Sequence, residues 1–217
     1  MCGRYTVFDE ESIIEMRRII REVEANFTPD DSAVQGSFTP DGQASFAVSP
    51  IQKGEIRPTD TVPVLFPGLE GWGYTPLPMR WGFPRPGDKQ GVIFNARSET
   101  AHTLPMFRRC LAERRIVVPS TGFYEWDHHG ASRTRYLFRP RGETMLYMAG
   151  IFNLFCDGFT EYPAFVILTR PADEVVGRYH DRMPVVIAKD NLSDWLHNDR
   201  ATRRLLHAPA NLQAISC

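Results

Sequence analysis

The sequence predicts an α+β domain with a mainly antiparallel sheet or an open barrel. Short apolar runs bounded by Gly, Pro, Asn and Asp recur along the chain, which is typical of strands. Helical segments fall between these runs without the regular strand–helix alternation of a parallel sheet. The chain has 217 residues, of which 42% are hydrophobic and 24% charged. This suffices for one large domain with a core, and no internal repeat or linker divides residues 1–217.

The clearest helix is predicted over residues 12–25. Apolar residues recur there at helical spacing, and Ser12 with Glu15 fits a capping box. Residues 27–54 are rich in Pro, Ser, Asp and Gly. We therefore expect a surface insertion there, with a short strand over residues 45–48.

The remaining elements follow from apolar runs and helical periodicity. Strands are predicted over residues 62–66, 79–83, 116–119, 122–126, 135–138, 145–152, 162–169 and 185–188. Helical segments are predicted over residues 103–114, 172–179, 192–196 and 201–207. The strands thus cluster in the chain, which favours antiparallel neighbours.

The charge pattern excludes a polybasic protein but leaves room for a local basic groove. The formal net charge is −1, and only three of the 25 basic residues are lysines. Arginine suits forked contacts with phosphate, although a GC-rich genome gives the same bias. No apolar run is long enough to span a bilayer, and the first residues lack the pattern of a signal peptide. We therefore expect a cytoplasmic protein.

The four cysteines predict neither disulfides nor a metal site. Cys2, Cys110, Cys156 and Cys217 lie far apart, with no C-x-x-C pair and no histidine at zinc spacing. Cys110 and Cys156 lie among apolar residues and are expected to be inert thiols in the core.

Cys2 differs from the other cysteines because it directly follows Met1. Aminopeptidases remove Met1 when the second residue is small, which would leave a terminal cysteine with both an amine and a thiol. An α-amine has a pKa of about 8, so roughly a quarter of it is neutral and nucleophilic at a pH of about 7.4. It can form an imine with an aldehyde, and the thiol can then close a thiazolidine ring. Alternatively, Cys2 is only a small residue before a strand over residues 4–8.

A polar segment follows an apolar pair at residues 94–100. Its Asn95 could orient an amine and its Arg97 could hold a phosphate. The alternative is an ordinary capped loop before a helix.

Two further segments carry groups suited to proton transfer. In a strand over residues 122–126, Glu125 faces away from Tyr124 and Trp126. A carboxylate among aromatic residues is a candidate for a raised pKa, unless it is exposed on an edge strand. His180 lies in a His-Asp-Arg cluster before a predicted strand and could titrate near neutrality.

Four segments in this order resemble the SRAP family, whose name stands for SOS response-associated peptidase and whose members process abasic sites. They are residues 1–4, 95–100, 122–126 and 180–184, with supporting matches at 58–65 and 80–83. One such motif alone is weak, whereas four in order are specific. The resemblance runs from Cys2 to about residue 187 and more loosely to the end of the chain.

The resemblance implies a sensor of abasic sites in single-stranded DNA that shields the lesion during the DNA damage response. Cys2 would form the thiazolidine crosslink through its amine and thiol after Met1 is removed. Asn95 would position this terminus, Glu125 would exchange protons with the amine and the sugar hydroxyl, and His180 would act at the sugar oxygen. Abasic-site lyase activity and self-cleavage after Met1 are further activities that the family suggests.

The resemblance also implies how DNA is held. Arg4 and Arg97 would bind phosphates beside the lesion, and Thr169 would add a phosphate hydrogen bond. The implied fold is an open, β-barrel-like core with peripheral helices. We expect a monomer that needs no cofactor or metal and joins the nucleoid on damage.

Two positions depart from the family. Glu55 stands where relatives commonly have Asn, which adds a negative charge near the expected groove. The loop over residues 83–89 has no aromatic residue beyond Phe83, where relatives often carry tryptophans that stack beside the lesion.

Two other functions fit parts of the sequence. Class II glutamine amidotransferases also begin Met-Cys-Gly and would use Cys2 as a thiolate, with its own amine as base. That function gives Glu125 and His180 no role. A module that binds damaged or modified DNA without bond formation would form only salt-reversible complexes.

Overall fold

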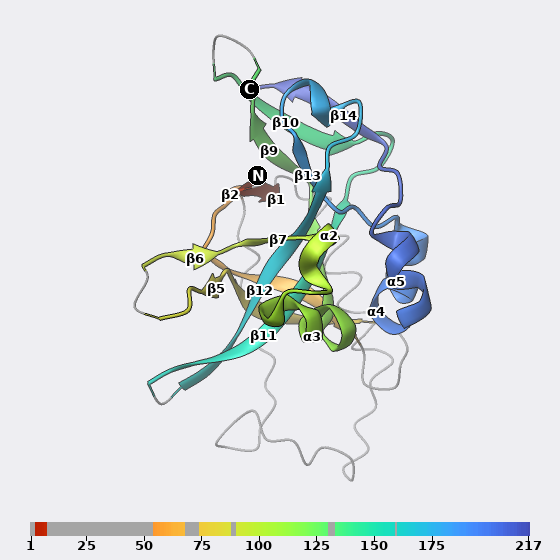
Figure 1. Cartoon of the computed structure of the whole chain (residues 1–217). Coiled ribbons are helices and arrows are strands. Elements are labelled where there is room, and N and C mark those ends of the chain that lie inside the picture. Colours follow the sequence, from red (N-terminus) through yellow and green to blue (C-terminus); the bar gives the residue numbers. More distant parts are fainter. Residues whose placement is uncertain (1–2, 8–53, 68–73, 88–89, 130–132, 159) are drawn as a thin grey trace.

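The computed structural model describes residues 3–7, 54–67, 74–87, 90–129, 133–158 and 160–217 (Figure 1). Cys2 and the predicted helix over residues 12–25 lie outside the described residues. The predicted insertion over residues 27–54 also lies outside them, apart from Gly54, which begins a strand.

The described chain is α+β with mainly antiparallel strand pairing, as the sequence predicts. The strands are β1 (Arg4–Val7), β2 (Gly54–Ile56), β3 (Thr61–Pro67), β4 (Tyr74–Trp81), β5 (Phe83–Pro84), β6 (Val92–Ile93), β7 (Asn95–Arg97), β8 (Arg115–Ser120), β9 (Gly122–Trp126), β10 (Arg135–Pro140), β11 (Leu146–Asp157), β12 (Thr160–Pro171), β13 (Arg182–Pro184) and β14 (Leu212–Ser216). The helices are α2 (Ser98–Ala101), α3 (Pro105–Glu113), α4 (Leu192–His197) and α5 (Asp199–Leu205), with 3₁₀ turns η1 (Val176–Arg178) and η2 (Lys189–Asn191). Among the described strands, the only parallel pairings are those of β12 with β4 and with β7.

A β-barrel forms the centre of the molecule. Five strands pair in the order β11-β8-β3-β4-β12, and β12 returns to β11 to close the ring. The predicted barrel-like core is therefore present, and its ring of strands is closed. Its interior includes Trp81, whose ring stacks on Phe165 with centroids 6.3 Å apart, and both are fully buried. The long pair β11 and β12 crosses the centre of the view (Figure 1).

A second, antiparallel sheet of order β14-β10-β9-β1-β2 packs beside the barrel. Tyr5 of β1 contacts the barrel through Trp81, with ring centroids 5.1 Å apart. Gly122 lets β9 approach β10 closely, because a Cβ atom there would lie 2.5 Å from the carbonyl oxygen of Phe138. β1 of this sheet begins at Arg4, two residues after Cys2 in the sequence.

Three predicted elements are corrected by the structure. Residues 185–188 form no strand, although β13 directly precedes them and Val186 makes an isolated bridge. The backbone N–H of Val185 donates to Leu168, whereas that of Ile187 donates to Tyr147. The segment thus crosses between two strands and cannot follow either one.

The helix predicted over residues 172–179 is reduced to the 3₁₀ turn η1. The Asp173 carboxylate accepts the backbone N–H groups of Val175 and Val176, which favours a tight turn. The strand predicted over residues 79–83 is divided at Gly82 between the end of β4 and the start of β5, which belong to different sheets. The other predicted strands and helical segments in the described chain are present, and several are longer than predicted. Strands β2, β6 and β14 were not predicted.

Candidate functional site

Glu125 is held in the middle of β9 and its side chain is 2% exposed. β1 pairs with Gly122–Tyr124 and β10 pairs with Phe123–Trp126, so the ladders fix the face of the sheet on which the Glu125 side chain lies. Tyr124 and Trp126 face the other side of the sheet, as strand alternation predicts. The expected burial of this carboxylate is therefore present, and the exposed edge-strand alternative is wrong.

Burial raises the pKa of Glu125 from 4.5 to about 7, while the positive charge of the chain's amino terminus partly opposes that rise. The charged form is disfavoured because few water molecules remain to solvate it. The carboxyl group therefore exchanges its proton near neutral pH, as a general acid–base catalyst must.

His180 lies before β13 and directs its imidazole toward Glu125. Its Nε2 is 3.8 Å from Oε2 of Glu125. Its Nδ1 accepts the backbone N–H of Arg182 at 2.9 Å. Because Nδ1 acts as an acceptor, the neutral ring carries its proton on Nε2, on the side that faces Glu125.

The prediction that His180 titrates near neutrality is wrong, because its imidazole is already neutral there. Burial, the positive amino terminus and nearby His128 together lower its pKa from 6.5 to about 4, and burial is the largest of these causes. The rings of His128 and His180 lie with centroids 4.6 Å apart. The pair formed by Glu125 and His180 therefore offers a carboxyl group that titrates near neutrality beside a fixed N–H donor.

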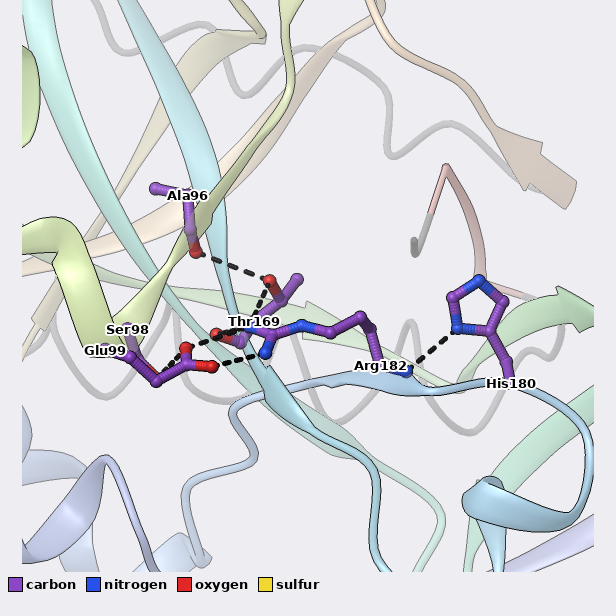
Figure 2. Close-up of polar contacts among 6 residues, drawn as sticks. All are labelled: Ala96, Ser98, Glu99, Thr169, His180 and Arg182. Carbon is purple, nitrogen blue, oxygen red and sulfur yellow. Dashed lines mark hydrogen bonds and ion pairs between the residues drawn. The ribbon is translucent and has the colours of Figure 1, made fainter.

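Arg182 connects His180 to the polar segment around α2 (Figure 2). Its guanidinium forms two hydrogen bonds with the carboxylate of Glu99, one of which measures 2.9 Å. It also donates to the carbonyl oxygen of Thr169 at 2.8 Å and to its hydroxyl at 3.2 Å. The hydrogen bonds between Arg182 and Glu99 lower the pKa of Glu99 to about 2, so this carboxylate is charged at neutral pH. The backbone N–H of the same arginine donates to His180, so Arg182 positions both the His180 imidazole and the Glu99 carboxylate.

Strand β7 brings Asn95 and Arg97 beside β12. The parallel register pairs Asn95 with Ile167 and Arg97 with Thr169, so all four residues share one face of the sheet. Arg97 is exposed, whereas Thr169 is fully buried. The hydroxyl of Thr169 lies between Arg182 and the carbonyl oxygen of Ala96. Thr169 thus contacts other residues of the protein in this structure, whereas the family resemblance implies a contact with phosphate.

Arg4 lies on the face of β9 opposite to Glu125. It pairs in the ladder with Tyr124, and its guanidinium lies 5.1 Å above the ring of Trp126. It also forms an ion pair of 3.0 Å with Glu55. Arg4 and Glu125 are therefore not brought together, although they flank the same end of β1.

Sequence reasoning missed two ion pairs that organise this region. Glu99 and Arg182 lie 83 residues apart in the sequence. Neither of the two motifs contains a pattern that predicts this pairing. The pair between Arg4 and Glu55 was also missed, although the unusual carboxylate at position 55 was a signal that could have revealed it.

The raised pKa of Glu125 has a consequence for stability. The folded protein binds this proton more tightly than the unfolded chain, since the pKa rises from 4.5 to about 7 on folding. Stability is therefore lost as pH rises from 4.5 through 7, by about 3 kcal/mol at a pH of about 8. We expect Glu125→Gln to unfold at higher urea concentration than wild type at this pH, with an advantage that shrinks toward a pH of about 5.

The matched control is Glu113→Gln, which removes an exposed carboxylate of α3 that is paired with Arg109. Its effect on stability should not follow the same pH window. A difference between Glu125→Gln and wild type that stays constant over this window would contradict the raised pKa.

No group of three or more potential metal ligands occurs among the residues that the structure describes. None of the described helices has the length and apolar character needed to cross a membrane.

The chain is similar to proteins whose names refer to abasic sites. It is 28% identical to the abasic site processing protein YoqW of Bacillus subtilis over 205 residues, which cover 91% of this chain and 80% of that protein. It is 31% identical to the abasic site processing protein YedK of Escherichia coli over 125 residues, covering 56% of this chain and 55% of the relative.

The fold is also found in solved structures. A crystal structure of a protein from Bordetella bronchiseptica superposes with a TM-score of 0.73 at 22% identity, covering 100% of this chain and 99% of the other. A family model described as "SOS response associated peptidase (SRAP)" matches residues 1–217. The chain therefore belongs to the SRAP family.

Proposed function

We propose that this protein recognises abasic sites in single-stranded DNA and forms a covalent thiazolidine adduct with them through Cys2. The observation that carries the proposal is the buried pair of Glu125 and His180, in which a carboxyl group with a pKa of about 7 faces a fixed N–H donor. Family membership and the names of the relatives support abasic DNA as the substrate.

The path of the chain supports Cys2 as the nucleophile at this pair. Arg4 pairs with Tyr124, which is the residue before Glu125. Cys2 lies two residues before Arg4, and consecutive Cα atoms are about 3.8 Å apart. Chain connectivity therefore limits how far the Cys2 amine and thiol can lie from Glu125.

The proposed reaction needs no oxidant or metal. The neutral Cys2 amine attacks the aldehyde carbon C1′ of the ring-opened sugar, a C–N bond forms, and the carbonyl oxygen gains a proton. The carbinolamine then loses water to give an imine. The Cys2 sulfur adds to C1′ of the imine and the thiol proton passes to nitrogen, which closes the thiazolidine ring. One water molecule is the sole by-product.

Glu125 and His180 suit the proton transfers of this sequence. The closed sugar must lose the proton of its hydroxyl and gain one at its ring oxygen before the aldehyde appears. Glu125 would take and return protons, because its pKa lies near neutrality. His180 would donate the hydrogen bond of Nε2–H to the sugar oxygen, because its Nδ1 is held by Arg182. Asn95 would orient the Cys2 amine.

The DNA backbone would lie along exposed cationic side chains. Arg97 is exposed at the end of β7, and Arg4 flanks the start of β1. Both would bind phosphates beside the lesion. Thr169 would contribute by holding Arg182 rather than by reaching phosphate itself, because its hydroxyl is buried between Arg182 and Ala96.

The mature protein is expected to begin at Cys2 and to form an adduct that survives denaturation. Intact mass should show the loss of one methionine, and a denaturing gel should show a shifted band with abasic single-stranded DNA but none with undamaged DNA. A non-covalent binding module would give no band, and an amidohydrolase would instead release ammonia from glutamine. A chain that retains Met1 and still crosslinks would contradict the role of the amine.

A further inference from the structure

Three arginines converge on one carboxylate on the face of the second sheet that lies away from Glu125. Arg4, Arg57 and Arg135 each contact Glu55, with nitrogen–oxygen distances of 3.0, 3.0 and 2.9 Å. These four side chains carry a net charge of +2 in a protein whose formal net charge is −1. A structural ion pair needs only one cation for each carboxylate, as Arg109 and Glu113 illustrate on α3. The cluster therefore has more positive charge than Glu55 can neutralise.

Aromatic rings beneath the arginines orient two of these guanidinium groups. Arg4 lies 5.1 Å from the ring centroid of Trp126, and Arg135 lies 4.5 Å from that of Tyr124. The ladders of β1, β9 and β10 place these two arginines and the two aromatic rings on one face of the sheet. Stacking on a ring leaves the edge of a guanidinium available for forked hydrogen bonds. The arrangement is thus a platform of alternating cations and aromatic rings.

The cations remain accessible to a ligand. The side chains of Arg57, Arg4 and Arg135 are 63%, 36% and 36% exposed, whereas Glu55 is 19% exposed. The neighbouring carboxylate of Asp60 accepts the backbone N–H of Arg57 at 2.8 Å. Glu55 lies deepest in the cluster, and the guanidinium groups extend beyond it toward solvent.

We propose that Arg57 and Arg135, adjoining the phosphate contact already assigned to Arg4, form a second phosphate-binding site for the backbone of single-stranded DNA, and that Glu55 weakens this site by competing for the arginines. The inference rests on the proposed function and extends it to the opposite face of β9. A strand that passes the start of β1 would contact Arg97 and the Glu125 face on one side and this cluster on the other. Trp126 and Tyr124 offer planes for base stacking beside the phosphates.

The test is the salt dependence of binding to undamaged single-stranded DNA, measured by fluorescence anisotropy. Arg57→Ala and Arg135→Ala should each flatten the slope of log K against log salt by about 0.7, the value for one lost phosphate contact. Arg135→Lys should keep the slope. Glu55→Gln should tighten binding by about fivefold at low salt and steepen the slope, since it removes a competing charge.

Matched controls lie on α3, where the same kind of ion pair occurs. Arg109→Ala and Glu113→Gln change the same charges and should leave the slope unchanged. Unchanged slopes in both Arg57→Ala and Arg135→Ala would overturn the site. A Glu55→Gln variant that binds no more tightly than Glu113→Gln would overturn competition by Glu55. Inorganic phosphate at the same ionic strength should compete weakly, and complete competition would indicate a site for free anions instead.

A parallel crosslinking assay with abasic DNA separates this inference from the proposed function. Crosslinking with unchanged salt slopes would overturn the second phosphate site and leave the chemistry of Cys2 intact. Flattened slopes in a protein that forms no adduct would support the site and contradict the covalent function.

Discussion

Mature protein with serine in place of Cys2 is expected to form no DNA adduct that survives denaturation, unless borohydride is present. Serine keeps the terminal amine, so the imine with C1′ still forms and reductant can trap it. The stable ring needs the sulfur, because the imine alone reverts in water. The unreduced imine should instead promote β-elimination, so cleavage of the abasic strand should rise. A denaturing gel with and without borohydride measures all three products.

The matched control for Cys2→Ser is Cys156→Ser, which alters a thiol near the end of β11. This thiol is exposed, so the prediction that it lies in the core is wrong; the last two residues of β11 are both exposed. The variant should crosslink like wild type, because the thiol at this position has no neighbouring terminal amine. A Cys2→Ser adduct as durable as that of wild type without reductant would rule out thiazolidine formation. Loss of crosslinking in Cys156→Ser would point to a different thiol.

The strands were predictable because their apolar runs alternate or are wholly buried. The run over residues 122–126 matches β9 at both ends. The run over residues 185–188 failed because it is equally apolar yet donates hydrogen bonds to two different strands. An apolar pattern predicts that a segment is buried. To form a strand, the segment must also pair continuously with one neighbouring strand. Such a partner is a property of the whole fold.

Strand β14 shows the opposite failure. Its five residues pair with β10 along its length, although Ile215 and Ser216 are exposed. An edge strand near the end of a chain has a weak apolar pattern, because one side faces solvent. Tertiary pairing with β10 determines this element more than its own sequence does.

The candidate site was predictable as a set of residue types but not as a geometry. Strand alternation around Glu125 correctly predicted that its side faces away from Tyr124 and Trp126. The tautomer of His180 depends on the backbone N–H of Arg182, and Arg182 in turn depends on Glu99, which is far away in the sequence. Contacts of this kind join segments that only the closed barrel brings together.

Glu125→Gln and His180→Ala are expected to slow crosslinking at different steps. Glutamine cannot exchange a proton, so Glu125→Gln should slow capture of abasic DNA by roughly 10²–10⁴-fold. It should also slow release, because a general acid–base catalyst assists both directions of one equilibrium. His180→Ala removes the Nε2–H donor near Glu125, and should slow ring opening by about 10²-fold while the final yield is kept.

The measurement is a time course of crosslinking, followed by transfer of the protein to excess competitor abasic DNA. If both residues only supported the fold, each variant would lose thermal stability and binding to undamaged DNA together with activity. The pKa of Glu125 argues against that role, because a buried carboxyl group raised to about 7 opposes folding at neutral pH and above. Glu125→Gln should therefore be at least as stable as wild type at a pH of about 8 while it crosslinks slowly. Normal capture and normal transfer in a folded Glu125→Gln would remove this residue from the mechanism.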